Sequence, residues 1–180
     1  GQMCITGSDI ITFYDIEKIY SREEYSLFVV VGSNLIIQRI FKLIKSKGVC
    51  LATYVSSKAS TWPNVVIGEN CFISEGNFIQ PFTSIGSNCI LFNNQIGHHC
   101  TIGNNVLLSV SILGGNVSIG AGSYIGMNTV IKQNIKIGEK NIMGMGCVIE
   151  QDTEPGSVYS NKGTVKRSIS YEKLFSRFLK

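Results

Sequence analysis

The sequence predicts a parallel β-helix built from six-residue repeats. An aliphatic or similar apolar residue returns every six positions over most of the chain, with two five-residue steps. The repeat positions are Ile67, Ile73, Ile79, Ile85, Leu91, Ile96, Ile102, Leu108, Leu113, Ile119, Ile125, Ile131, Ile137, Met143 and Ile149. Fixed-period self-similarity of this kind is typical of a solenoid. A unit of six residues is too short for a packed helix and suits one short strand with a tight corner.

Two further positions of the repeat support this prediction. Glycine follows the apolar residue at Gly68, Gly86, Gly97, Gly103, Gly114, Gly120, Gly126, Gly138 and Gly144. A small or β-branched residue stands four positions after it at Cys71, Thr83, Cys89, Cys100, Val106, Val117, Ser123, Thr129, Cys147 and Thr153. We expect the apolar and small side chains to point inward, with glycine and asparagine at the corners. Three repeats then form a coil of about eighteen residues, which is stable only when stacked on its neighbours.

The residues before the repeats predict a small, incomplete α/β segment of the Rossmann-like kind. Leu27–Val31 is an all-apolar run typical of a buried parallel strand. Gly32-Ser33-Asn34 follows as a turn and helix N-cap. Leu35–Lys47 has apolar residues at helical spacing, and Gly48 is expected to end that helix. A second short helix is expected at Ile16–Tyr20.

Three regions are therefore expected: a partial α/β segment over residues 1–52, a β-helix over 53–154 and a basic tail over 155–180. The first coil is expected to begin near Val55, and Pro155-Gly156 to interrupt the repeat. A short C-terminal helix is expected at Tyr171–Lys180. Residues 162–180 carry six basic side chains against one acid, so this tail accounts for the net charge of +4. Such a tail suits a phosphate-bearing ligand, an anionic surface or an acidic partner, or it is a solvated terminal helix.

Composition argues against several classes of protein. No apolar run approaches the roughly twenty residues needed to cross a bilayer, and residues 1–15 lack the pattern of a signal peptide. Four of the six cysteines stand at the small-residue position of the repeat, and none shows metal-type spacing. We expect reduced thiols in a cytoplasmic protein that binds no metal. A zinc prism needs three separated imidazoles, whereas this chain has two adjacent histidines.

Those two histidines, His98 and His99, are the candidate catalytic residues. They follow Ile96 and Gly97, in or beside a corner, so at least one side chain should project outward. An imidazole titrates near neutral pH and can take a proton from an amine or hydroxyl as it attacks. The alternative from these residues alone is a pair of surface corner side chains.

Three stretches resemble the hexapeptide-repeat sugar acyltransferases of the sialic-acid O-acetyltransferase type, which include N-acetyltransferases of nucleotide-linked amino sugars. Leu27–Asn34 and the helix after it resemble the last strand and helix of their small nucleotide-sugar-binding domain. Ile96–Gly103 resembles their segment of form I-x-H-[D/E]-C-x-I-G. Gly114–Gly120 resembles their G-N-V-x-I-G step one coil later. The resemblance implies that the β-helix is left-handed and that the protein is a homotrimer.

The same resemblance implies a reaction and a site. Acetyl-CoA would be the cosubstrate, bound in a groove between the prisms of adjacent subunits. The acceptor would be an amine or hydroxyl of a sugar, nucleotide-linked as in part of that family, in bacterial surface-polysaccharide biosynthesis. His98 would be the general base of a direct attack, and a backbone N–H near Gly115 would meet the acetyl carbonyl. The implied coenzyme contacts are Gly115, Gly126, Gly144, Lys166 and Arg167, the implied catalytic residues are His98 and His99, and the implied substrate contact is Asn34.

Departures from the family pattern keep a second hypothesis open. His99 replaces the family's acid, and Leu107 replaces a further histidine. The chain has no counterpart of the strand, glycine-rich turn and strand that hold the nucleotide, so nucleotide-sugar binding is not carried over. These departures favour a non-catalytic β-helix scaffold in an oligomeric assembly. In either case, copies of the chain are expected to cover apolar side chains on the flat faces, namely Phe72, Phe78, Phe82, Ile90 and Phe92.

Overall fold

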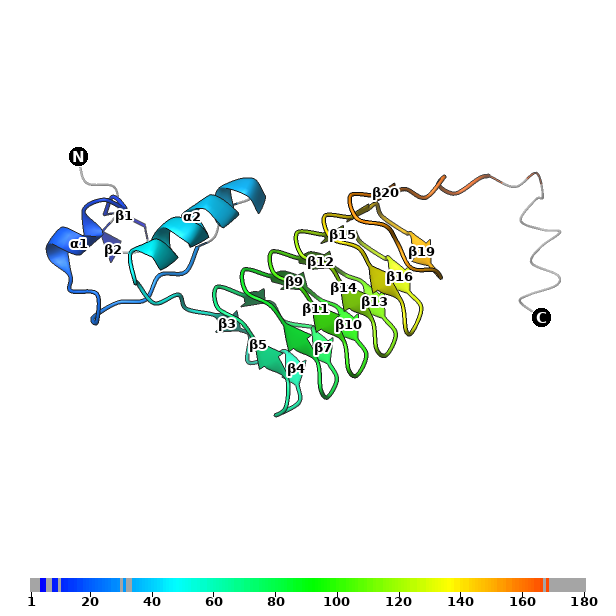
Figure 1. The fold of residues 1–180 in the computed structure, drawn as a ribbon, viewed down its shortest axis with the longest axis horizontal. Helices are drawn as coiled ribbons and strands as arrows, with labels where there is room; N and C mark the ends of the chain where they lie inside the picture. Colours follow the sequence, from blue (N-terminus) through cyan, green and yellow to red (C-terminus); the bar gives the residue numbers. More distant parts are fainter. Residues whose placement is uncertain are drawn as a thin grey trace.

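The structure is a computed structural model that describes residues 4–5, 8–9, 11–29, 31, 34–166 and 168 of the chain. A small N-terminal unit precedes a long prism of stacked coils, and the described residues after β20 extend away from the last coil (Figure 1). No helix among the described residues is long and apolar enough to cross a membrane. The C-terminal helix predicted at Tyr171–Lys180 lies outside the described residues.

Three parallel sheets form the three walls of the prism (Figure 1). The first wall contains β3 (Tyr54–Val55), β6 (Phe72–Ile73), β9 (Ile90–Phe92), β12 (Leu107–Ser109), β15 (Tyr124–Ile125), β18 (Ile142–Met143) and β20 (Val158–Tyr159). The second wall contains β4 (Ser60–Thr61), β7 (Phe78–Ile79), β10 (Gln95–Ile96), β13 (Ile112–Leu113), β16 (Val130–Ile131) and β19 (Val148–Ile149). The third wall contains β5 (Val66–Ile67), β8 (Ser84–Ile85), β11 (Thr101–Ile102), β14 (Ser118–Ile119) and β17 (Lys136–Ile137).

Corners between the walls stack into three edges, which we name by the walls they join. The first edge joins the first wall to the second and contains residues 56–59, 74–77, 93–94, 110–111, 126–129 and 144–147. The second edge joins the second wall to the third and contains residues 62–65, 80–83, 97–100, 114–117, 132–135 and 150–152. The third edge joins the third wall to the first and contains residues 68–71, 86–89, 103–106, 120–123, 138–141 and 154–157.

The apolar repeat residues point into the prism, as the sequence predicts. From Ile73 to Ile149, each of them has at most 6% of its surface exposed. The small residues at the corners, such as Cys71, Cys89 and Cys100, are fully buried beside them. Each coil therefore buries its apolar side chains against the coils above and below, and the predicted left-handed parallel β-helix is confirmed.

Both five-residue steps of the repeat fall at the first edge, in consecutive coils. They separate Leu91 from Ile96 and Leu108 from Leu113. The short corners pass through Asn93 and Val110, which both have a positive φ, of 51° and 48°. Because the two short corners lie one above the other, the ladder stays in register, and Ile96 pairs with Ile79 on one side and Leu113 on the other.

Buried asparagines bind backbone and side-chain groups where the chain turns. Asn94 is fully buried, donates from Nδ2 to Asn77 Oδ1 over 3.0 Å and accepts from the Ser111 N–H over 2.8 Å. A second chain of asparagine side chains follows the third edge through Asn70, Asn88 and Asn105. At its end, the Val29 N–H donates to Asn70 Oδ1 over 2.8 Å, which joins the N-terminal unit to the prism.

The N-terminal unit contains two predicted helices, α1 (Ile16–Ile19) and α2 (Asn34–Ser46), and an antiparallel pair of strands, β1 (Cys4–Ile5) and β2 (Ser8–Asp9). Both helices are confirmed within a residue or two, and Gly48, with φ of 71°, follows α2 in the left-handed conformation expected after a helix. Asn34 is the first residue of α2 instead of its N-cap.

The strand predicted at Leu27–Val31 is wrong in extent. Among the described residues of this run, 27–29 and 31, only Leu27 pairs, in a single parallel bridge with Leu51. Val29 is buried instead by packing in a cluster with Ile37 and Ile44 of α2. Val29 is therefore apolar because α2 covers it, while the Phe28 ring stacks on Phe72 of the prism, and the described part of this unit does not confirm the Rossmann-like assignment.

The ladder also continues past Glu154, where the sequence suggested an interruption. β20 pairs in parallel with β18, placing Val158 opposite Ile142. Pro155-Gly156 lies in a third-edge corner, where Gly156 has φ of 74° and its N–H donates to Glu139 O over 2.8 Å. The dipeptide turns the chain into a further strand because proline and glycine suit a tight corner as well as a break.

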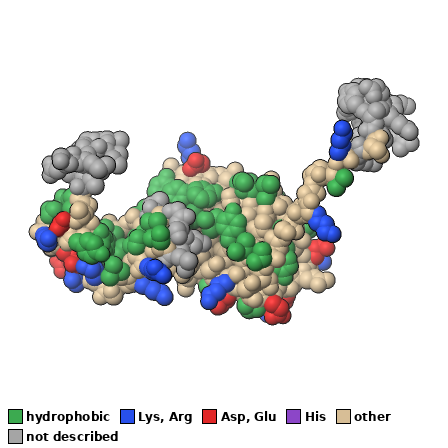
Figure 2. Space-filling model, turned by 90° about the horizontal axis from the view of Figure 1, so that it is seen from above, with side chains coloured by type: hydrophobic (Ala, Val, Ile, Leu, Met, Phe, Trp, Pro, Cys, Tyr) green, Lys and Arg blue, Asp and Glu red, His purple; other side chains and the backbone are tan. Residues whose placement is uncertain are grey.

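Apolar side chains remain exposed along the prism body, and Figure 2 shows many of them gathered on the face seen from above. On the second wall they are Phe78, Ile112, Val130 and Val148. The first wall also exposes Phe92, Tyr124, Ile142 and Val158, whereas the third wall exposes Val66 and otherwise directs Ser84, Thr101, Ser118 and Lys136 outward. One expectation is wrong: Phe82 lies in a second-edge corner, not on a flat face, and is 61% exposed.

Candidate functional site

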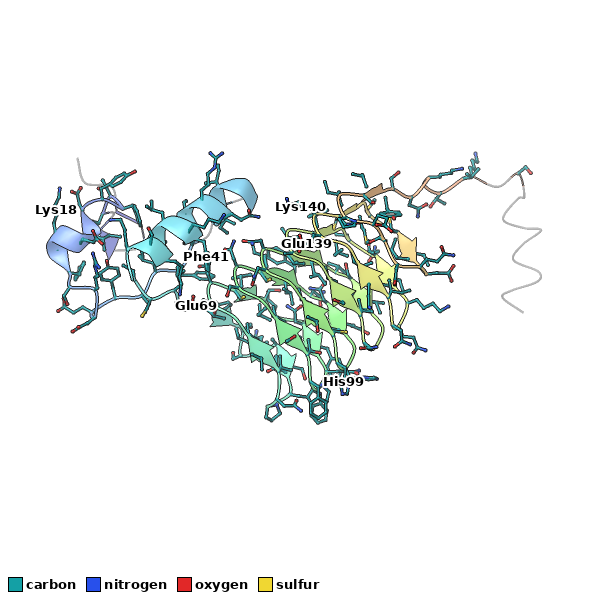
Figure 3. The ribbon with its side chains drawn as sticks, viewed as in Figure 1. Lys18, Phe41, Glu69, His99, Glu139 and Lys140 are labelled. Carbon is teal, nitrogen blue, oxygen red and sulfur yellow. The ribbon has the colours of Figure 1, made fainter. Side chains whose placement is uncertain are left out.

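His98 and His99 lie in the second-edge corner between β10 and β11, and both side chains are exposed. Figure 3 shows His99 at the edge of the prism opposite Glu69, Glu139 and Lys140. The His99 N–H donates to Pro81 O in the coil before, over 3.0 Å. His98 O accepts from the Asn116 N–H in the coil after, over 2.8 Å. Neighbouring coils thus fix the backbone of both histidines.

The two imidazoles contact each other through their Nδ1 atoms, which are 3.0 Å apart. Their rings are nearly perpendicular, at 87°. A hydrogen bond between two Nδ1 atoms requires that one of them carries a proton. If His98 is to accept a proton at Nε2, its own Nδ1 must be the donor and His99 Nδ1 the acceptor. The structure therefore brings both predicted catalytic residues together in one hydrogen-bonded pair.

Gly115, in the next coil, lies directly against the His98 ring. A Cβ atom at Gly115 would be 2.7 Å from His98 Cε1 and 2.8 Å from Nε2. Only a residue without a side chain leaves room for the ring in this position. The Gly115 N–H has no hydrogen-bond acceptor among the described residues, although Gly115 O accepts from the Asn134 N–H. An imidazole nitrogen and an unused backbone donor thus stand side by side on consecutive coils.

The remaining predicted contacts do not join this cluster within one chain. Gly126 and Gly144 follow β15 and β18 at the first edge, whereas His98 and Gly115 lie at the second. Lys166 is exposed in the extended segment after β20, and Arg167 lies outside the described residues. Asn34 begins α2 in the N-terminal unit.

Sequence reasoning missed two residues that support the histidines. The Phe82 ring stacks on His99, with centroids 4.8 Å apart and planes at 28°. Gln80 Oε1 accepts from the His98 N–H over 3.2 Å. Aligning successive coils would have found them, because Phe82 occupies the corner position of His99 one coil earlier, and Gln80 precedes it by two residues.

Cys100, next to His99 in sequence, does not point toward this site. It is fully buried, and its Sγ donates to Gly114 O over 3.3 Å. Burial raises the pKa of the Cys100 thiol, so the thiolate is disfavoured. Across the described residues, no three histidine, cysteine or acidic side chains come together as metal ligands. The chemistry available at this corner is that of imidazole and backbone N–H.

Comparison with known proteins places this fold among acetyltransferases. No protein-family model matches the chain. The acetyltransferase domain of PglB from Neisseria gonorrhoeae FA1090 is 25% identical, with a TM-score of 0.82 over 89% of this chain and 80% of that one. A structure of the same domain in complex with acetyl coenzyme A is 23% identical, with a TM-score of 0.82.

A second neighbour is perosamine N-acetyltransferase from Caulobacter crescentus, as a histidine-to-asparagine mutant in complex with CoA and GDP-perosamine. It is 23% identical, with a TM-score of 0.80 over 88% of this chain and 77% of that one. WeeI from Acinetobacter baumannii AYE is 22% identical, with a TM-score of 0.73 over 87% and 76%. These neighbours confirm the predicted resemblance to β-helical sugar acetyltransferases at the level of the fold.

Proposed function

We propose that this protein is an acetyl-CoA-dependent acetyltransferase that acts on an amine or hydroxyl group of a sugar. Two structural neighbours support the cosubstrate and the acceptor class, because one holds acetyl coenzyme A and the other holds CoA with GDP-perosamine. The observation that carries the proposal is the His98 ring against Gly115. A base and an oxyanion donor are the two groups that direct acyl transfer requires.

The roles follow from the geometry of these two residues. Acetyl-CoA supplies a thioester whose carbonyl carbon is open to attack. His98 Nε2 removes the proton from the attacking amine or hydroxyl, while the Gly115 N–H donates to the carbonyl oxygen as negative charge develops there. The acceptor forms a bond to the acetyl carbon, the bond from that carbon to sulfur breaks, and CoA leaves as a thiolate that takes up the proton held on His98 Nε2. A preorganised N–H of this kind contributes about 3 kcal/mol to comparable acyl transfers.

His99 takes the place of an orienting acid in this proposal. The two Nδ1 atoms are 3.0 Å apart, and we assign His98 Nδ1–H as the donor and His99 Nδ1 as the acceptor, which leaves Nε2 of His98 unprotonated. A neutral imidazole stabilises the His98 imidazolium less than a carboxylate would. Because Cys100 is buried away from the site, we propose direct transfer without an acyl-enzyme.

We further propose a homotrimer that works in the cytoplasm on precursors of a bacterial surface polysaccharide. The exposed apolar second wall supports association between copies. Gly126 and Gly144 at the first edge, with Lys166 beyond the last coil, would then line the coenzyme groove of a neighbouring protomer, and we propose Arg167, outside the described residues, as a further coenzyme contact. We also propose Asn34, at the start of α2, as a sugar contact. Five cysteines of the described part are free thiols, in keeping with a reducing compartment.

Calorimetry with acetyl-CoA, paired with assays of CoA release, tests the function. We expect wild type and His98→Ala to bind acetyl-CoA with similar affinity. His98→Ala should lose about 100- to 10,000-fold in kcat on a sugar acceptor. Wild-type turnover by a folded His98→Ala protein would contradict the assigned base. Failure of a folded, oligomeric wild-type protein to bind acetyl-CoA would instead support the non-catalytic scaffold.

A further inference from the structure

Two exposed aromatic rings and two prolines precede the histidines along the second edge. We call Trp62, Pro63, Pro81 and Phe82 the aromatic edge; they occupy the first two second-edge corners. Trp62 is 50% exposed and Phe82 is 61% exposed. The aromatic edge therefore offers flat, apolar surface to a ligand on the N-terminal side of His98, while Gly115 lies on the C-terminal side.

Phe82 adopts a backbone conformation that its side chain does not favour. Its φ is 60°, in the left-handed region, and the equivalent corner positions of later coils are His99, Asn116 and Asn134. Asparagine tolerates this conformation, whereas a bulky aromatic residue is strained in it. Burial does not offset the strain, because most of the ring is exposed. An exposed aromatic ring held in a strained corner beside a candidate base indicates a role in function.

The aromatic edge is joined to the catalytic pair by direct contacts. The Phe82 ring stacks on His99, whose Nδ1 contacts His98 Nδ1. Gln80 and Asn64 each use their side-chain oxygen to accept a backbone N–H, from His98 over 3.2 Å and from Phe82 over 3.3 Å. Their NH2 groups have no acceptor among the described residues, so both remain available to a ligand.

The electrostatic character of this surface limits what it can bind. None of the second-edge residues from Trp62 to Val117 is an acid, a lysine or an arginine, and the first charge along the edge is Lys132. The opposite edge carries Glu69, Glu139 and Lys140 (Figure 3). A carboxylate on the ligand would find no cation here to compensate for its desolvation. An uncharged sugar ring suits the surface, because its C–H face packs on aromatic rings and its hydroxyls accept from amide NH2 groups.

We propose that the aromatic edge is the acceptor subsite and that it binds an uncharged pyranose ring against Trp62 and Phe82. This inference rests on the proposed acetyltransferase function and narrows its acceptor to a sugar ring without a carboxylate, as opposed to a sialic acid. The bound ring lies within reach of His98 from the side opposite Gly115. Acceptor and acetyl donor thus approach the base from the two neighbouring coils.

Trp62 is the single tryptophan of the chain, so its fluorescence reports directly on this subsite. We would titrate the methyl glycosides of mannose, glucose and sialic acid into the protein, with and without acetyl-CoA. The expected result is a saturable change with the two neutral glycosides and none with the sialic-acid glycoside. Phe82→Leu should weaken the binding about three- to tenfold. Tyr14→Ala, which removes an exposed aromatic ring from the N-terminal unit, should leave the binding unchanged.

The readout separates this proposal from the proposed function, because it requires no acetyl transfer. Saturable glycoside binding without acetyl transfer to any acceptor would support sugar binding at the aromatic edge and reject the proposed acetyltransferase function. The subsite is overturned if no glycoside changes the fluorescence, or if the sialic-acid glycoside binds more tightly than the neutral ones. It is also overturned if Phe82→Leu changes the oligomeric mass by light scattering while glycoside binding stays as in wild type, since the edge would then be a contact between copies.

Discussion

Replacing Gly115 with alanine tests the proposed arrangement of base and oxyanion donor. The added Cβ would lie 2.7 Å from His98 Cε1 and 2.8 Å from Nε2. Ordinary contacts between such atoms are about 3.5–4.0 Å, so the imidazole must move by roughly 1 Å. Misplacement of a catalytic group by this distance costs about 100-fold in rate, or about 2.7 kcal/mol of barrier. We expect kcat of Gly115→Ala to fall by about that factor.

The same substitution should leave the fold intact. Gly115 is not among the glycines with positive φ, so alanine is compatible with its backbone. The His98 side chain is exposed and can rotate toward solvent. We therefore expect the free energy of unfolding to change by less than about 1 kcal/mol. Chemical denaturation followed by circular dichroism measures this change, and release of CoA thiol measures the rate.

A double-mutant cycle with His98→Ala shows whether the effect passes through the imidazole. If it does, Gly115→Ala should reduce the residual rate by less than about twofold once His98 is absent, because no ring remains to be displaced. Wild-type kcat in Gly115→Ala would refute the reasoning. So would a full 100-fold loss in the His98→Ala background, which would assign the damage to the backbone or to the coenzyme site.

Three further predictions concern residues outside this pair. Cys100→Ser should keep wild-type kcat, and Cys100 should resist iodoacetamide at neutral pH, because the thiol is buried and its pKa is raised. Loss of activity in Cys100→Ser would instead indicate that the reaction passes through a covalent intermediate on Cys100. Asn94→Ala should lower the free energy of unfolding by about 1–3 kcal/mol, since it leaves the buried Ser111 N–H without its acceptor, while Asn77 Oδ1 still accepts from the backbone N–H of residue 94; the exposed Gln151→Ala is the control in urea titrations. Lys166→Ala should raise the acetyl-CoA Kd about threefold if it contacts a phosphate, and an unchanged Kd by calorimetry would remove it from the site.

The β-helix could be predicted because its inward pattern is local in sequence. Each strand contributes one inward residue, so a regular repeat must appear when coils stack. The two five-residue steps can also be placed from the sequence. They begin seventeen residues apart, which is about one coil, so both must fall at the same edge of the prism. Pro155-Gly156 could not be interpreted in the same way, because the dipeptide ends a repeat as readily as it forms a corner. Only the pairing of β20 with β18 distinguishes the two outcomes.

The N-terminal unit and the site were harder to predict for the same physical reason. Both depend on contacts between side chains of different elements or different coils. The apolar run around Val29 is buried by α2, and a sheet would produce the same sequence pattern. His98 and His99 could be chosen as candidates from their residue type. Their Nδ1 contact, the fit of the ring over Gly115 and the stacking of Phe82 depend on side-chain directions in adjacent coils. No spacing rule for a single repeat contains that information.

The predicted coenzyme contacts argue for a site shared between copies. His98 and Gly115 lie at the second edge, whereas Gly126 and Gly144 lie at the first, and the apolar core of the prism separates the two edges. Within one chain these residues therefore lie at two different edges of the prism. They can line one groove if the first edge of one protomer meets the second edge of the next, a head-to-tail contact that a ring of subunits closes. The second wall lies between the two edges and exposes Phe78, Ile112, Val130 and Val148, so an apolar surface suited to contact between copies adjoins both halves of the proposed site.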